Sequence, residues 1–244
     1  MALVTGASRG IGRAIALELA SRGAGIAFNY LRSHGPARET EQAVVALGVE
    51  CLRRRASLAD ADAIETLFEA IEARFGRLDI LVNNAASGVM RPAAALEKKH
   101  WAWTLDTNAR GPWLCSVAAA RLMRDGGRIV NITSPGATRV LSDYFAVGVS
   151  KAALEALTRY LAIELAPQNI AVNAVSAGYV LTDALSAFQD KEAVVRKASR
   201  PTPAGRIVQP EDVARVVAFL CEDASEMIRG QVILVDGGQT LVQD

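Results

Sequence analysis

The sequence predicts an α/β protein in which seven parallel strands form one doubly wound sheet with helices on both faces. Short apolar runs alternate with longer runs of helical periodicity along all 244 residues. The composition agrees, because 51% of the residues are hydrophobic but only 5% are aromatic, as is typical of parallel strands covered by helices. No linker, repeat or low-complexity tract divides the chain, so we expect a single domain over residues 1–244.

The expected strands are short and rich in Val, Ile and Leu, and glycine or polar residues bound most of them. They lie at residues 1–5, 26–29, 49–52, 78–82, 128–132, 170–175 and 232–235. The expected helices lie at 11–21, 36–47, 60–75, 96–123, 151–166, within 183–199 and at 210–221. Right-handed crossovers between parallel strands then place helices on both faces of the sheet.

The charge and the cysteine content exclude several classes of function. The formal net charge is +1, so neither nucleic acid nor a membrane is expected as a partner. No apolar run approaches the roughly 18 residues that span a bilayer, and no signal peptide is expected because the sequence opens directly on a predicted strand. Three scattered cysteines without a CxxC pair, and only two histidines, argue against disulfides and against a metal site. We therefore expect a soluble, cytoplasmic protein with reduced thiols.

A glycine-rich turn follows the first strand and precedes the first helix. It reads TGASRGIG, with Gly6, Gly10 and Gly12 in a G-x3-G-x-G pattern. Glycines allow a tight turn and a close approach to a pyrophosphate, whose charge the amides at a helix N-terminus favour. Polar clusters at 83–84, 133–134 and 176–182 follow other strands, and ligands bind at such carboxyl ends. The pattern predicts a Rossmann-type dinucleotide site.

The end of the second strand indicates which dinucleotide binds. An acidic residue there would bind the ribose 2′-hydroxyl and repel a 2′-phosphate. The chain reads NYLR at 29–32 and has no carboxylate until Glu39, while Arg9 lies within the glycine turn. Arg9 and Arg32 therefore favour NADPH over NADH, because guanidinium groups pair with the extra phosphate. The alternative is that both arginines are ordinary solvated surface residues.

A hydroxyl, a phenol and an ammonium follow the fifth strand, at Ser134, Tyr144 and Lys151. If the next helix has begun by Tyr144, the seven-residue spacing to Lys151 corresponds to roughly 10.5 Å and one helix face. A phenol can donate a proton, and a neighbouring ammonium is expected to lower its pKa towards neutrality. The alternative is a surface lysine and a half-buried tyrosine.

Taken together, these residues resemble the short-chain dehydrogenase/reductase family, and the resemblance covers the whole chain. It rests on TGASRGIG, NNAA at 83–86, Asn108, Ser134, Lys151, SAG at 176–178 with Thr182, and VDGG at 235–238. Three positions depart from the family pattern: Ala86 replaces a glycine, Ala177 a proline, and Ser57 an acidic residue or asparagine. The cofactor contacts that the resemblance implies are Gly6, Ser8, Arg9, Gly10, Ile11, Gly12, Tyr30, Arg32, Ser57, Leu58, Asn83, Ala85, Lys151, Gly178, Val180 and Thr182.

The position of the tyrosine is the main departure. The usual family motif is Tyr-x3-Lys, but counting back from Lys151 leads to Val147, which cannot donate a proton. Tyr144 gives Tyr-x6-Lys instead, and this spacing, with NNAASGVMRP and MIRGQ, resembles the NADPH-dependent bacterial enoyl-acyl-carrier-protein reductase III type. The resemblance implies that Tyr144 acts on the enolate, that Lys151 holds the nicotinamide ribose, and that Asn108 supports a water chain to Lys151.

An enoyl substrate gives this spacing a physical reason. Hydride reaches C3 of a 2-enoyl thioester while charge develops on the C1 oxygen, roughly 3 Å away by standard bond lengths. In ketone reduction the two atoms are only about 1.2 Å apart. A phenol moved by nearly one helical turn suits the longer separation and can stabilise the enolate. Ser134 is either a secondary donor or a residue that stabilises its loop.

A lid at about 183–206 is expected over the substrate, which is an acyl thioester on acyl carrier protein or coenzyme A. The expected substrate contacts are Ala86, Ser134, Tyr144, Leu185 and Phe188. The basic residues Lys191, Arg196, Lys197, Arg200 and Arg206 either dock an acidic carrier or are simply solvated. The family resemblance also implies a homotetramer formed through the two long helices, although an intramolecular core explains the apolar run at 152–165 equally well.

Two other functions remain open from the sequence. A 3-oxoacyl thioester or other carbonyl reductase would use Tyr144 swung into the usual place. A non-catalytic NADPH-binding protein would have lost its acid at Val147.

Overall fold

The computed structural model describes residues 1–182, 188 and 190–242. Within them, seven strands form one parallel sheet in the order β3-β2-β1-β4-β5-β6-β7, which confirms the expected fold class. The strands are β1 (Ala2–Val4), β2 (Ile26–Tyr30), β3 (Cys51–Arg55), β4 (Ile80–Asn83), β5 (Gly127–Thr133), β6 (Ile170–Ala177) and β7 (Val232–Val235). The chain reverses its direction of travel across the sheet between β1 and β4, so the ligand crevice is expected there.

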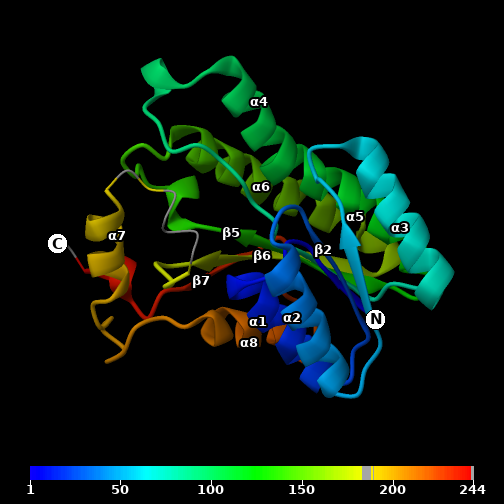
Figure 1. Ribbon diagram of the computed structural model, residues 1–244. Coiled ribbons are helices and arrows are strands. Elements are labelled where there is room, and N and C mark those ends of the chain that lie inside the picture. The colour runs from blue at the N-terminus through cyan, green and yellow to red at the C-terminus, as the bar shows by residue number, and fades with distance from the viewer. Residues whose placement is uncertain (183–187, 189, 243–244) are drawn as a thin grey trace.

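Helices cover both faces of this sheet (Figure 1). One face carries α1, α2 and α8, and the other carries α3, α4, α5 and α6. Their bounds are α1 (Gly10–Ser21), α2 (His34–Ala46), α3 (Ala61–Phe75), α4 (Lys98–Leu105), α5 (Gly111–Leu122), α6 (Phe145–Glu164), α7 (Lys191–Ala198) and α8 (Pro210–Leu220). Among the described residues, no helix is long and apolar enough to cross a membrane.

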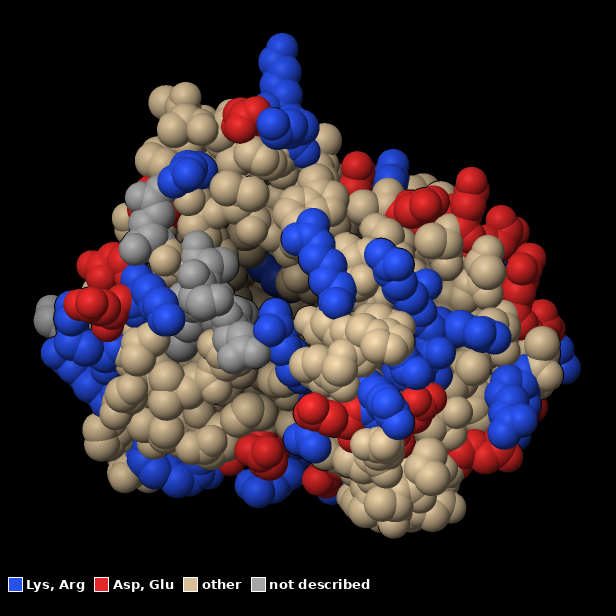
Figure 2. All heavy atoms as spheres, in the orientation of Figure 1, with Lys and Arg blue, Asp and Glu red and all other residues tan. Residues whose placement is uncertain are grey.

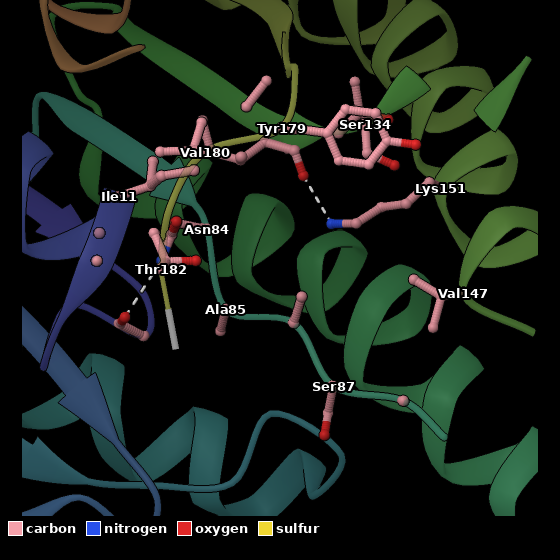
Figure 3. A pocket seen from close by; sticks show the side chains of 18 of the residues that line it. Ile11, Asn84, Ala85, Ser87, Ser134, Val147, Lys151, Tyr179, Val180 and Thr182 are labelled. Atoms are coloured by element: carbon pink, nitrogen blue, oxygen red, sulfur yellow. Dashed lines mark hydrogen bonds between the residues drawn. The ribbon is translucent and has the colours of Figure 1, made fainter. Parts of the chain in front are cut away.

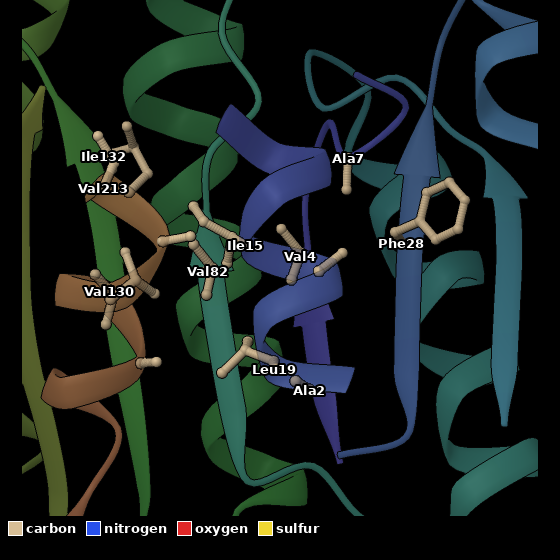
Figure 4. Packing of buried hydrophobic residues seen from close by; sticks show 14 of the residues in the cluster. Ala2, Val4, Ala7, Ile15, Leu19, Phe28, Val82, Val130, Ile132 and Val213 are labelled. Carbon is tan, nitrogen blue, oxygen red and sulfur yellow. The ribbon is translucent and has the colours of Figure 1, made fainter. Parts of the chain in front are cut away.

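The hydrophobic core lies in two layers because side chains alternate along each strand. Val4 pairs with Val82, and both belong to the cluster that packs against Ile15 of α1 (Figure 4). Their neighbours Leu3 and Leu81 also pair, and they belong to the second cluster, on the opposite face. The strands are thus buried on both sides, as the apolar runs of the sequence predict.

Two details of the helices differ from the sequence predictions. The region expected as one long helix at 96–123 is divided into α4, a π-helical stretch at Asp106–Arg110, and α5. The π-helical stretch carries the buried Asn108. The helix after β5 begins at Phe145, so Tyr144 occupies the N-cap position, immediately before the first helical residue. The main-chain carbonyl of Tyr144 nevertheless accepts the first helical hydrogen bond, from Gly148 N at 2.6 Å.

Candidate functional site

A cavity of about 1050 Å³ lies at the carboxyl ends of the strands. Its walls are the loops that follow β1, β2, β3, β4, β5 and β6, together with residues 197–203 and 239–242. A cavity of this size exceeds what a small substrate alone requires. All but two of the residues predicted to contact cofactor or substrate line it. Those that do are Gly6, Ser8, Arg9, Gly10, Ile11, Gly12, Tyr30, Arg32, Ser57, Leu58, Ala85, Ala86, Ser134, Tyr144, Lys151, Gly178, Val180, Thr182 and Phe188, whereas Asn83 and Leu185 are considered separately below.

The glycine turn is locked against the loop that follows β4. Asn84 Nδ2 donates to Thr5 O at 2.8 Å and to Gly6 O at 3.2 Å (Figure 3). Thr5 Oγ1 in turn accepts from the amides of Asn84 and Ala85 at 2.9 Å. A Cβ at Gly12 would overlap Asn84 Nδ2 and lie 2.7 Å from Gly6 O. Glycine at position 12 is therefore a steric requirement of this turn, as expected for a backbone that approaches a pyrophosphate.

The wall after β2 carries no carboxylate among its described lining residues. Arg32 extends over the ring of Trp103, with its guanidinium carbon 5.9 Å from the ring centroid. The hydroxyl of Tyr30 is held by His34 Nδ1 at 2.8 Å and receives a hydrogen bond from Arg53 Nη1 at 3.2 Å. This fixes the ring of Tyr30 in the wall. Arg9 and Arg32 leave this end of the cavity positive.

The phenol, the hydroxyl and the ammonium come together in one wall. Tyr144 OH lies 3.2 Å from Ser134 Oγ. Lys151, in the second turn of α6, donates from Nζ to the carbonyl of Ile132 at 2.7 Å (Figure 3). The Tyr144 ring stacks on Phe188, with the centroids 5.7 Å apart and the planes 8° apart. Gly136 allows this packing, since a Cβ there would lie only 2.5 Å from the Tyr144 ring.

Burial determines the protonation of both groups. Burial raises the pKa of Tyr144 above its ordinary value of 10, and the hydrogen bond from Ser134 opposes this only partly. The sequence prediction that the pKa of Tyr144 is lowered towards neutrality is therefore wrong. Burial also lowers the pKa of Lys151 from 10.5 to about 8, against the opposing charge of Glu155. At neutral pH Tyr144 is a proton donor and Lys151 is a cation.

Val147 occupies the place of the usual family tyrosine. It lines the cavity, is only 5% exposed, and sits so close to the loop after β4 that a Cβ at Gly88 would overlap its methyl group. Tyr179 is a further phenol in the cavity, besides Tyr30 and Tyr144, and the sequence analysis missed it. Its charge contributes to the raised pKa of Tyr144. Its position directly after Gly178, in the loop that follows β6, was the available signal.

One predicted cofactor contact, Asn83, does not line the cavity. Asn83 is buried within the sheet, where its Nδ2 donates to Ser116 Oγ at 3.3 Å and to Asn131 Oδ1 at 2.9 Å. The structure gives no support to its predicted contact with the cofactor, because Asn84 and not Asn83 lines the cavity. Leu185 lies outside the described residues.

Asn108 lies one layer behind the wall. Its Oδ1 accepts from Ser87 N at 2.8 Å, and its Nδ2 donates to Ser87 O at 2.8 Å and to Ser150 Oγ at 3.0 Å. It thus ties the loop after β4 to the residue before Lys151. In this geometry Asn108 positions the site.

The fold and the site together define a class of protein. A glycine turn at the switch point of a doubly wound sheet, facing a phenol and an ammonium, is typical of dinucleotide-dependent oxidoreductases. The comparisons with known proteins agree. A family model described as enoyl-(acyl carrier protein) reductase matches residues 6–240. The chain belongs to the short-chain dehydrogenase/reductase superfamily, whose members use NAD(P)H.

Individual relatives differ in their reactions. A 1-cyclohexenylcarbonyl-CoA reductase of Streptomyces collinus is 36% identical over 244 residues, covering 99% of this chain and 87% of the relative. The 3-oxoacyl-(acyl-carrier-protein) reductase FabG of Staphylococcus aureus is 38% identical over 250 residues, covering 97% and 96%. A solved double mutant of a short-chain dehydrogenase/reductase from Serratia marcescens superposes with a TM-score of 0.89 at 36% identity, covering 98% and 97%.

Proposed function

We propose that this protein uses NADPH to reduce the 2,3 double bond of a trans-2-enoyl thioester. The observation that carries the proposal is the pair Tyr144 and Val147. The usual place of the acid holds a buried valine, while a protonated phenol lies in the cavity three residues earlier. This arrangement suits an acceptor oxygen that is roughly 3 Å from the carbon receiving hydride.

The residues present fit the dinucleotide. The glycine turn lines the cavity at the N-terminus of α1, where it would take a pyrophosphate, and Arg9 and Arg32 would hold the 2′-phosphate. The ammonium of Lys151 would hold the nicotinamide ribose, and Val180 and Thr182 line the part of the cavity that would take the carboxamide. When bound, the dinucleotide supplies the hydride.

The protein's own part in the reaction is to stabilise an oxyanion. Tyr144, neutral at neutral pH, would donate its hydrogen bond to the thioester oxygen as charge develops there. Ser134 holds the phenol oxygen in place through a hydrogen bond and can help to stabilise the developing charge. Burial of the phenol keeps water away, which strengthens this hydrogen bond.

A carbonyl reductase is the second candidate, favoured by the similarity to FabG at 38% identity. The two candidates differ in one assay. Crotonyl and acetoacetyl thioesters, each on coenzyme A, are offered with NADPH, and NADPH oxidation is followed. We expect turnover of the crotonyl thioester. Turnover of acetoacetyl thioester alone would establish carbonyl reduction, and cofactor binding without any oxidation would indicate a non-catalytic protein.

The proposed substrate is carried on acyl carrier protein or coenzyme A, and the proposed assembly is a homotetramer. Large apolar side chains are exposed on α5, at Trp113 and Val117, and on α6, at Phe145 and Val149. Such faces are typical of subunit contacts. The cysteines are free thiols, which suits the proposed cytoplasmic location.

A further inference from the structure

The charged side chains that line the cavity all have one sign. Among the described residues, no carboxylate lines it, and the charged lining residues are Arg9, Arg32, Arg139, Lys151, Lys197 and Arg200. Figure 2 shows Lys and Arg atoms around and within the hollow on this face. Arg9 and Arg32 lie at the end assigned to the adenosine, and Lys151 lies at the reacting centre. Arg139 and Arg200 are assigned neither to the adenosine end nor to the reacting centre, so we expect them to bind a second anion.

Arg139 and Arg200 border the same turn, at residues 236–240. The charge of Arg139 acts on the carboxylate of Asp236. The segment that follows Arg200 packs on this turn, because Ala204 N donates to Gly237 O at 3.1 Å and a Cβ at Gly237 would overlap Thr202. Two arginines from distant parts of the sequence thus line the same cavity, and the same turn lies near both of their chain segments.

Among the described residues, neither guanidinium lies within ion-pair distance of a carboxylate, although the charge of Arg139 reaches Asp236. Asp236 uses its oxygens within the turn, accepting from Gly238 N at 2.8 Å and from Thr240 N and Oγ1 at 2.8 and 2.7 Å. The other arginines of the basic lid segment differ, since Arg196 pairs with Glu192 at 3.8 Å and Arg206 with Asp212 at 2.6 Å. Neighbouring carboxylates thus neutralise part of the charge of the predicted basic patch. Arg200 is the arginine of this patch that lines the cavity.

We propose that Arg139 and Arg200 bind the phosphate of a 4′-phosphopantetheine arm. This inference rests on the proposed function, because it assumes a thioester at Tyr144. Guanidinium groups bind phosphate through paired, charge-assisted hydrogen bonds. The thioester sulfur and the phosphorus of an extended arm are separated by roughly 15 Å. Arg139 is five residues from Tyr144, so at most roughly 18 Å of chain separates them. Both arginines are exposed, as a carrier outside the cavity requires.

The test compares three thioesters that share one reacting group. Crotonyl-pantetheine lacks the phosphate, crotonyl-4′-phosphopantetheine carries it, and the pantetheine monothioester of a trans-2-enedioic acid carries a carboxylate at the acyl end instead. The variants are Arg139→Gln, Arg200→Gln and their combination, with Arg196→Gln as the matched control from the same segment. Calorimetric titration of the NADPH-loaded protein with 4′-phosphopantetheine and with pantetheine measures the site without turnover.

In the wild type and in Arg196→Gln, the phosphate should raise kcat/KM about ten-fold or more, mainly through KM. The double variant should lose this preference, and the titration should show the same pattern. If no thioester is reduced, the proposed function fails, but the titration still reports on the site. Equal binding of both arms by the wild type, or a preference that survives in the double variant, would overturn the proposal. An increase in kcat/KM with the acyl-end carboxylate, but not with the phosphate, would also overturn the proposal.

Discussion

Replacement of Tyr144 by phenylalanine tests the proposed chemistry most directly. The substitution removes one hydroxyl and leaves the ring, which is stacked on Phe188 and packed against Gly136. If the hydroxyl is the donor to the enolate oxygen, its loss should lower kcat by about 10²–10³-fold, as the loss of one aimed donor does in other enzymes.

The same geometry predicts what Tyr144→Phe leaves intact. The hydroxyl has one described hydrogen bond, to Ser134 Oγ at 3.2 Å, so the free energy of unfolding should change by about 1 kcal/mol or less. NADPH affinity should also persist, because the glycine turn and Lys151 are unaltered. The defect should therefore appear in kcat, with little change in Tm.

The assay is NADPH oxidation with crotonyl-CoA at saturating cofactor, together with a fluorescence titration of NADPH. Tyr160→Phe is the matched control, because Tyr160 lies on the same helix but is 71% exposed and does not line the cavity. We expect the control to behave as the wild type. Turnover by Tyr144→Phe within a factor of about three of the wild type would refute the role assigned to Tyr144.

Four further predictions follow from the site and its surroundings. Because burial lowers the pKa of Lys151 from 10.5 to about 8, the unfolded chain binds this proton more tightly between those values. Urea denaturation should therefore show the wild type gaining up to about 3 kcal/mol over Lys151→Met as the pH rises through that window, and a constant difference would contradict this. Gly12→Ala should lower both Tm and NADPH affinity because its Cβ meets Asn84 and Gly6, whereas Gly35→Ala, whose Cβ meets nothing within 4 Å, should lower neither. The double variant Arg9→Gln/Arg32→Gln should reduce the ratio of kcat/KM for NADPH over NADH about ten-fold or more, and an unchanged ratio would remove these residues from cofactor choice. Val149→Glu should shift the species seen by light scattering towards smaller assemblies, and Val140→Glu, in an exposed loop, should not.

The sheet could be predicted from the sequence because its signals are local. Each strand is a short apolar run between glycine or polar residues, and burial on both faces leaves little choice of structure. The seven strands were found within a few residues of their observed bounds. The π-helical stretch at Asp106–Arg110 was not, because its sequence does not interrupt the helical periodicity.

The sequence predicts most of the residues that make up the site, but not the pKa values of its titratable groups. Spacing alone indicates that Tyr144 and Lys151 can converge, and the structure places both in the cavity wall. The pKa values depend on burial and on neighbours far apart in sequence, so the pKa of Tyr144 is raised by burial where the sequence predicted that it is lowered. Asn83 and Asn84 could not be distinguished either, since only the direction of each side chain from β4 decides which one meets the cavity.

The raised pKa of Tyr144 changes how the relocated phenol must work. A phenol ionised at neutral pH would repel a developing enolate, whereas a buried, neutral phenol can donate to it. Val147 and the loop at Gly88 pack closely where the usual acid would lie, so little space remains there for a second acid close to the hydride-accepting carbon. The cavity thus combines a proton donor, Tyr144, that lies away from the usual position of the acid, with a cation, Lys151, whose Nζ donates to the carbonyl of Ile132. Under the proposed function, this position of Tyr144 would supply the separation between the carbon that receives hydride and the proton donor that conjugate reduction requires.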